Sequence, residues 1–251
     1  MAKEYKLKVA GADGCKGGWF VVIASVMNKN NQRAVRCVLK LESLVVVNTF
    51  SEVISETTNC KLVCVDIPIG LSDAKPRECD LAARKVLGRL RSSSVFAAPV
   101  RACLSANSYN RASEICFECS GKRLNKQGFF LLSKICQVDD LMTPELQRRV
   151  REIHPEVSFW ALNGKKAMQY SKRSLMGRRE RMEALSADFS EIEQIMAKAC
   201  RAGQAGPDDI LDGLVAAWTA GQAVMGKAET LPQRPELDGK GLRMEILCPA
   251  G

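Results

Sequence analysis

The segment VAGADGCKGGWFVVI at residues 9–23 constrains the fold of this chain more than any other segment. An apolar stretch ends at Asp13, and a stretch rich in β-branched and aromatic residues begins at Trp19. The glycines between them suit a tight turn, because glycine has no Cβ to clash at positive φ. The segment therefore predicts two antiparallel strands with Asp13 at the carboxyl end of the first.

A second aspartate follows a second apolar run. The run LVCV at 62–65 is continuous, which is typical of a strand buried on both faces, and it ends at Asp66. The chain thus places a carboxylate at the end of a buried strand twice. The elements predicted up to this point are strands at 6–12, 19–27 and 33–41 in an antiparallel meander, a polar turn at 28–31, a helix at 49–57 and a strand at 62–66.

Residues 71–143 are predicted to form a large helical insertion. Ile-Pro-Ile-Gly leaves the sheet directly after Asp66, because proline cannot donate to a central ladder. The insertion is rich in arginine, including Arg77 and Arg101, which favours a lid or substrate platform. A solvated helical face explains any single arginine equally well. We expect one domain over residues 1–251 that contains this insertion.

The C-terminal part predicts a helix with a buried face. Leu211, Leu214 and Trp218 share one side of this helix at 100° per residue, and Asp212 lies at the edge of that side. Acidic residues in a first helical turn offset the helix dipole, but this effect does not extend to Asp212. An aspartate beside a packed face needs a partner. The elements predicted here are a helix beginning at Thr143, a strand at 153–159, a long amphipathic helix at 176–201, the final helix from Gly206 and a closing strand at 241–247.

The charge balance favours contact with phosphates. The chain has 37 basic and 28 acidic residues, which gives a formal net charge of +9. An excess of this size suits a nucleic acid or nucleotide partner, and simple solubility is the other explanation.

The cysteine pattern and the hydropathy favour a reducing compartment. The 11 cysteines are odd in number and irregular in spacing, so we expect free thiols. Cys116 and Cys119 form one CxxC, but the sequence has only one histidine, which does not favour a structural zinc site with four ligands. We find neither an apolar signal segment nor a membrane span, and we expect a cytoplasmic protein without a membrane partner.

Asp13, Asp66 and Asp212 suggest a common site. Three carboxylates that converge repel one another unless a cation neutralises them, and oxygen ligands suit Mg²⁺ or Mn²⁺. Two such ions can activate a water and stabilise the leaving oxygen of a phosphodiester. Structural ion pairing is the alternative role for these three residues.

Seven motifs spread over most of the chain resemble the domain-of-unknown-function family 429. That family is regarded as predicted nucleases with a ribonuclease H-like fold. The motifs are GADGCKGGW at 11–19, VDIPIGL at 65–71, RECD and AAR at 77–84, SSVFAAPVR at 93–101, SKICQVDDL at 133–141, REIHPEVSF at 151–159 and DDILDGLVAAWTA at 208–220.

The resemblance implies an α/β fold: a ribonuclease H-like mixed sheet, with the antiparallel three-stranded meander and further parallel strands flanked by helices. It also implies a divalent-metal-dependent nuclease that hydrolyses nucleic acid. Nucleases of this fold carry acidic residues at the end of the first strand, on the fourth strand and on the last helix. The implied catalytic residues are Asp13, Asp66, Glu156, Asp209 and Asp212, of which Asp13, Asp66 and Asp212 are the implied metal ligands; Lys16, Arg77, Arg101 and His154 are candidates for substrate binding.

Two other functions stay open at this point. An actin- or sugar-kinase-type phosphotransferase would use the Asp13 hairpin to hold ATP phosphates, but we find no second Asp-Gly-Gly hairpin for the paired domain of such proteins. A binding protein without catalysis would use the same scaffold and positive charge for nucleic acid or a phosphorylated ligand. The sequence contains no base-reading module, so any specificity is expected to be for shape.

Overall fold

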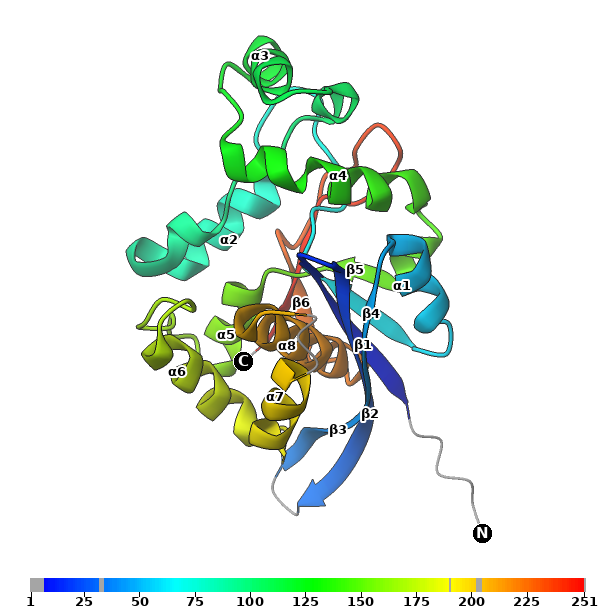
Figure 1. Ribbon diagram of the computed structural model, residues 1–251, viewed down its shortest axis with the longest axis vertical. Helices are drawn as coiled ribbons and strands as arrows, with labels where there is room; N and C mark the ends of the chain where they lie inside the picture. Colours follow the sequence, from blue (N-terminus) through cyan, green and yellow to red (C-terminus); the bar gives the residue numbers. More distant parts are fainter. Residues whose placement is uncertain (1–6, 32–33, 190, 202–204, 251) are drawn as a thin grey trace.

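A five-stranded mixed sheet forms the centre of the computed structural model, which describes residues 7–31, 34–189, 191–201 and 205–250 (Figure 1). The strand order is β3-β2-β1-β4-β5; β1, β2 and β3 pair antiparallel, whereas β4 and β5 run parallel to β1. This order, with these directions, is that of the ribonuclease H-like fold, so the predicted fold class is confirmed. The strands are β1 (Lys8–Cys15), β2 (Gly18–Asn31), β3 (Ala34–Val47), β4 (Leu62–Val65) and β5 (Val150–Glu152).

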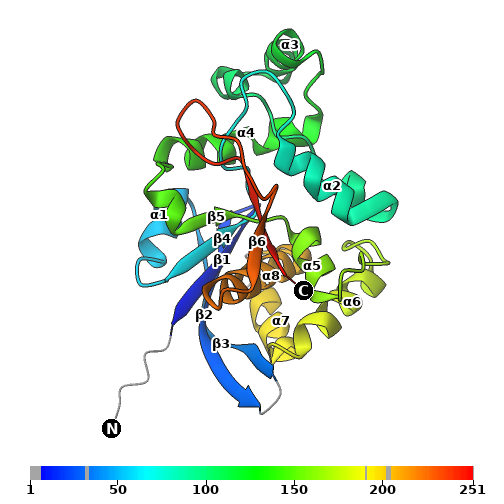
Figure 2. The same cartoon turned by 180° about the vertical axis from the view of Figure 1, so that it is seen from behind.

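Helices cover both faces of this sheet (Figures 1 and 2). On one face, α1 (Phe50–Glu56) and α4 (Lys126–Leu141) pack on apolar side chains of β1 and β2. On the other face lies α8 (Pro207–Val224), which contacts α5 (Pro155–Leu162), α6 (Leu175–Ser186) and α7 (Ile192–Arg201). Two more helices, α2 (Glu78–Arg91) and α3 (Tyr109–Ser120), belong to the chain between β4 and β5. The division of the chain into one domain with an insertion at 71–143 stays a prediction.

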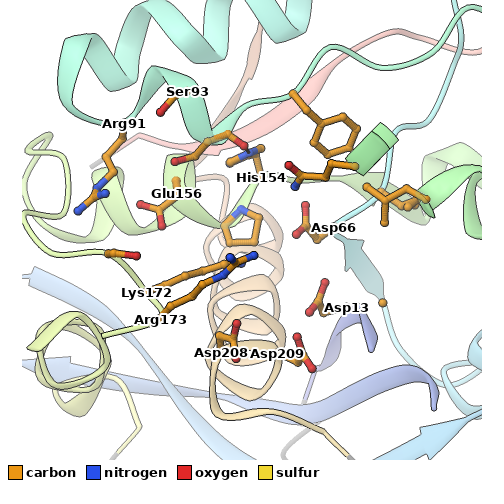
Figure 3. A pocket seen from close by; sticks show the side chains of 18 residues that line it. Asp13, Asp66, Arg91, Ser93, His154, Glu156, Lys172, Arg173, Asp208 and Asp209 are labelled. Atoms are coloured by element: carbon orange, nitrogen blue, oxygen red, sulfur yellow. Dashed lines mark hydrogen bonds between the residues drawn. The ribbon is translucent and has the colours of Figure 1, made fainter. Parts of the chain in front are cut away.

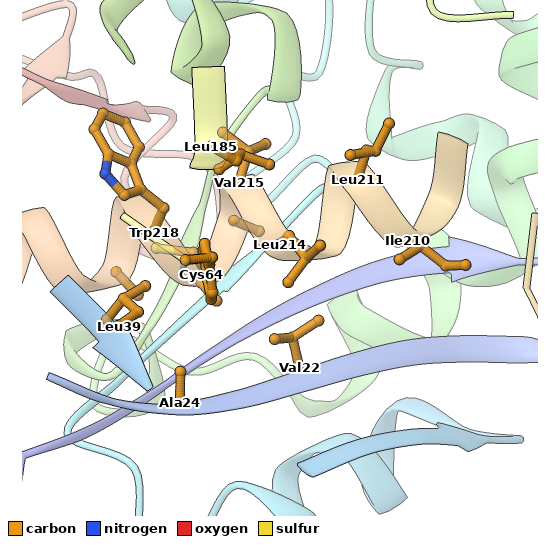
Figure 4. Packing of buried hydrophobic residues seen from close by; sticks show 14 of the residues in the cluster. Val22, Ala24, Leu39, Cys64, Leu185, Ile210, Leu211, Leu214, Val215 and Trp218 are labelled. Atoms are coloured by element: carbon orange, nitrogen blue, oxygen red, sulfur yellow. The ribbon is translucent and has the colours of Figure 1, made fainter. Parts of the chain in front are cut away.

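The contact between β1 and α8 is unusually close. From Ile210 to Gly221 every residue of α8 is buried, and Figure 4 shows this helix lying against the sheet. A Cβ at Gly11 would lie 2.2 Å from both Ala217 N and Gly213 O, so only glycine allows the two backbones to meet here. The helix therefore lies directly over β1, the strand that carries Asp13.

Several helices form where the sequence predicts them. Thr49 caps α1 and forms a capping box with Glu52, and the final helix begins after Gly206 as expected. The predicted strand at 153–159 is wrong. Pro155 takes the first position of α5, where its missing N–H is not needed, and the last strand of the sheet is the preceding segment β5.

The structure corrects four other predictions of secondary structure. The helix predicted over 176–201 is two helices, α6 and α7. The segment after Thr143 forms only a 3-10 turn at Leu146–Arg148. The closing strand is β7 (Ile246–Pro249), which pairs with β6 (Ala228–Leu231) in a separate two-stranded sheet. The residues predicted as a polar turn, 28–31, extend β2, and the predicted strand ends Lys6 and Arg33 lie outside the described residues.

No helix in the described ranges combines the length and apolar character needed to cross a bilayer.

Candidate active site

A cavity of about 440 Å³ lies at the carboxyl ends of β1 and β4, beside the first turns of α5 and α8. The end of α2, one face of α4 and the segment before α6 complete its walls (Figure 3). Both acidic and basic side chains face this one space. The charged lining residues are Asp13, Asp66, Glu156, Asp208, Asp209, Arg91, Lys172 and Arg173, and the polar ones include Ser93, Ser94, Gln127, His154 and Ser171.

Strand register brings Asp13 and Asp66 together. Ala12 pairs with Val65 in the parallel ladder, and the Asp66 N–H donates to the Ala12 carbonyl over 3.0 Å, so the next residue of each strand lies beside the other. Side chains alternate between the two faces of a strand. Val9, four positions before Asp13, belongs to the apolar cluster that packs against α8, and so do Cys64 and Leu62, two and four positions before Asp66. Both aspartates therefore lie on the α8 side of the sheet.

The close approach of α8 adds a third carboxylate. Asp212 is 1% exposed, and its Oδ2 accepts a hydrogen bond from the Lys172 ammonium. Its Oδ1 is buried without a hydrogen-bond partner among the described residues. Asp209, one helical turn earlier, lines the cavity and accepts from the Gly206 N–H over 3.0 Å, so one of its oxygens caps the helix.

The three buried carboxylates act on one another's pKa. Burial, followed by the charges of Asp66 and Asp212, raises the pKa of Asp13 well above its usual value. Burial and the charge of Asp212 raise the pKa of Asp66 to about 8. Burial also raises the pKa of Asp212, although Lys172 opposes that shift. Near neutral pH the cluster therefore retains a proton unless a further cation is present.

Lys172 supplies positive charge to this cluster. Burial alone would lower its pKa, but the carboxylates of Asp212 and Asp66 raise it, so the side chain is an ammonium. Figure 3 shows the side chain extending across the cavity toward the aspartates.

Glu156 and His154 line another side of the cavity. One oxygen of Glu156 accepts from the Arg181 guanidinium, and the other, Oε2, is buried without a partner in the described ranges. The Nε2 of His154 lies 3.4 Å from the Ser94 carbonyl oxygen. Burial lowers the pKa of His154, so the imidazole is neutral at pH 7.

Arg77, predicted to bind substrate, is buried and forms salt bridges within the protein. Its guanidinium is 2% exposed and donates to both carboxylate oxygens of Glu152, over 2.7 and 2.8 Å, and to Asp80 over 2.6 Å. Glu152 in turn accepts from the Ile69 N–H over 2.7 Å. The arginine thus fastens the segment after Asp66 to the end of β5, and its donors are already engaged within the protein.

Arg101 and Lys16 also lie away from the cavity lining. Arg101 pairs with Asp139 over 2.7 Å and with Asp238, which ties α4 to the C-terminal segment. Lys16 is exposed in the turn between β1 and β2 and does not line the cavity. Of the four predicted substrate-binding residues, only His154 lines it.

The sequence did not single out the basic residues that do face the cavity. These are Arg91 at the end of α2, and Lys172 and Arg173 in the irregular segment before α6. The chain has 37 lysines and arginines, so charge alone does not distinguish these three. Their position depends on how α2 and the segment before α6 fold back toward the sheet.

The donor atoms at this site suit a hard divalent cation. They are carboxylate oxygens, and two of them, Asp212 Oδ1 and Glu156 Oε2, are buried without a hydrogen-bond partner among the described residues. As the side chains stand, no three His, Cys, Asp or Glu residues in the described ranges form a group that could hold a metal ion. Among the described residues, the side chain that forms a salt bridge with this cluster is Lys172, through Asp212.

Comparison with known proteins places the chain in a family. None of the curated proteins compared with it matches. Among solved structures, the "Thermus thermophilus RuvC structure" is similar over 88% of this chain and 97% of its own, with 13% identical residues and a TM-score of 0.36. The model of one family matches residues 11–237, which include most of β1 and all of β4 and α8. The chain therefore belongs to the family described as "Protein of unknown function (DUF429)".

Proposed function

We propose that this protein is a divalent-metal-dependent nuclease that hydrolyses phosphodiester bonds of nucleic acid. The observation that supports this function best is the cluster of Asp13 in β1, Asp66 directly after β4, and Asp212 in α8. Burying carboxylates together is costly, and strongly perturbed acids at the edge of a cavity are typical of functional sites.

The three aspartates would hold Mg²⁺ or Mn²⁺, since carboxylate oxygens are the ligands that these ions prefer. When bound, the ion would polarise the phosphodiester and lower the pKa of an attacking water. The protein's own groups have other tasks. Glu156 has a free oxygen that can accept a proton, and neutral His154 can accept or donate one at Nδ1, which lacks a partner in the described part of the chain. Asp209 caps the first turn of α8 and also lines the cavity.

The basic side of the cavity suits the phosphate backbone. Arg91 donates its Nε to the Met168 carbonyl over 2.7 Å, which fixes the guanidinium at the cavity wall. Arg173 is exposed at the same cavity. Guanidinium groups bind phosphates bidentately, and contacts of this kind position a nucleic acid without reading its sequence.

The test is metal-dependent cleavage by an Asp13→Asn variant. Labelled single-stranded, double-stranded and branched DNA and RNA are incubated with Mn²⁺, and cleavage and binding are measured separately. We expect the variant to lose at least about 100-fold in cleavage rate, the scale of removing one electrostatic contact at an active site, and to keep most of its binding.

Asp140→Asn is the matched control, because Asp140 is an exposed aspartate on α4 outside the cavity lining. Unchanged cleavage by the Asp13 variant would contradict the proposal. Binding without cleavage by the wild type on every substrate would favour the binding protein instead.

A further inference from the structure

Lys172 is the one side chain that forms a salt bridge with any of the three clustered aspartates within the described ranges. Its ammonium bonds to Asp212 Oδ2, and the charges of Asp66 and Asp13 also act on it. The contact joins a side chain that is 37% exposed to one that is 2% exposed. The ammonium thus reaches a buried carboxylate from the solvent side of the cavity.

The lysine belongs to a part of the chain without regular structure. It lies between the end of α5 at Leu162 and the beginning of α6 at Leu175. The aspartates, in contrast, are held by β1, the end of β4 and the buried helix α8. A rotation of the Lys172 side chain toward solvent therefore moves one lysine and leaves the carboxylates in place.

We propose that the Lys172 ammonium is a resident counter-ion of the carboxylate cluster, and that a divalent cation binds there only by displacing it. This inference rests on the proposed function, because it concerns the same cluster. The ammonium and a divalent ion would both need the carboxylate oxygens around Asp212, and like charges at such short range repel each other strongly. Lys172 would stabilise the metal-free protein and lower its affinity for the metal.

Mn²⁺ binding to the full-length protein provides the first test, measured by calorimetry or by the loss of the free Mn²⁺ paramagnetic resonance signal. Lys172→Met keeps the length of the side chain and removes its charge. We expect the variant to bind Mn²⁺ at least about tenfold more tightly than the wild type, which corresponds to about 1.4 kcal/mol. Lys172→Arg keeps the charge, and we expect it to bind no more tightly than the wild type.

Lys166→Met is the matched control for loss of one charge. Lys166 is exposed in the same segment between α5 and α6, and no salt bridge involves it in the described part of the chain. We expect its Mn²⁺ affinity to equal that of the wild type. Equal affinities of the Lys166 and Lys172 methionine variants would overturn the inference.

A second measurement uses the wild type, so it does not depend on how well a variant folds. The reactivity of individual lysines toward an amine-acylating reagent is followed by mass spectrometry with and without Mn²⁺. We expect the acylation of Lys172 to rise at least about threefold when Mn²⁺ binds, as the amine leaves Asp212 for solvent, and that of Lys166 to stay the same. Saturation with Mn²⁺ without increased Lys172 acylation would overturn displacement.

These outcomes separate the inference from the proposed function. Tighter Mn²⁺ binding by Lys172→Met in a protein that cleaves no nucleic acid would support the counter-ion and contradict the nuclease. Metal-dependent cleavage with equal Mn²⁺ affinity in Lys172→Met and the wild type would support the nuclease and contradict the counter-ion.

Discussion

Replacing Asp66 by asparagine should make the metal-free protein more stable at alkaline pH. The pKa of this carboxyl is about 8 in the folded protein, against its ordinary value of 3.8, because burial and the charge of Asp212 disfavour its ionised form. A group whose pKa is raised on folding stabilises the protein below its unfolded pKa, and this contribution is lost as the pH rises through the folded pKa. Asp66 should therefore weaken the wild type progressively between about pH 4 and pH 8.

The size of this loss of stability follows from the shift in the pKa of Asp66. About 4 pH units at about 1.36 kcal/mol each correspond to a loss of about 5 kcal/mol over this range. Asparagine has nearly the same shape and does not ionise. The difference in unfolding free energy between Asp66→Asn and the wild type should thus grow from near zero at pH 4 to several kcal/mol in favour of the variant at pH 8.

The assay is urea unfolding at a series of pH values with a chelator present, so that no metal ion stabilises the wild type. Asp140→Asn, at an exposed site, should show no such pH-dependent difference. An Asp66 variant that is less stable than the wild type at pH 8, or a stability difference that does not change with pH, would refute a raised pKa of Asp66.

Three further predictions concern the fold and the cavity wall. Gly11→Ala puts a Cβ 2.2 Å from two backbone atoms of α8, so we expect a loss of at least about 1–3 kcal/mol in urea unfolding, and an unchanged midpoint would contradict the close contact. Arg77→Met leaves Glu152 buried without its partner and should cost about 3–5 kcal/mol in the same assay; a stable variant with weakened nucleic-acid binding would restore the substrate role. Arg173→Ala should weaken nucleic-acid binding similarly for all sequences and reduce the slope of log K against log salt by about one, whereas a sequence-dependent loss would contradict a phosphate contact.

The parts of the fold that the sequence predicted well are those with strong local signals. The Asp13 hairpin, the capped helix after Thr49 and the apolar run before Asp66 each combine a hydrophobic pattern with a turn or cap residue. The segment from His154 to Phe159 is also apolar, and its pattern does not distinguish a buried strand from a buried helix. Pro155 favours the helix over a strand, because proline fits the first position of a helix.

The candidate site was predictable where carboxylates follow strands, and not where long basic side chains meet them. Asp13 and Asp66 lie together because the parallel pairing of β1 with β4 brings the carboxyl ends of both strands to one edge of the sheet, and side-chain alternation puts both carboxylates on one face. Glu152, which pairs with Arg77, and Asp212, which pairs with Lys172, are far away in sequence, so these pairs depend on how separate segments pack. An arginine that binds phosphate and one that binds a buried glutamate have the same sequence signal.

The central claim is that Asp13, Asp66 and Asp212 form a divalent-metal site whose resident cation is Lys172. Anomalous diffraction from a crystal of the wild type soaked in Mn²⁺ tests it most directly. We predict an anomalous peak in contact with the carboxylates of Asp13, Asp66 and Asp212, with the Lys172 ammonium moved away from Asp212. A crystal saturated with Mn²⁺ that shows no peak there, and Lys172 still bound to Asp212, would contradict it.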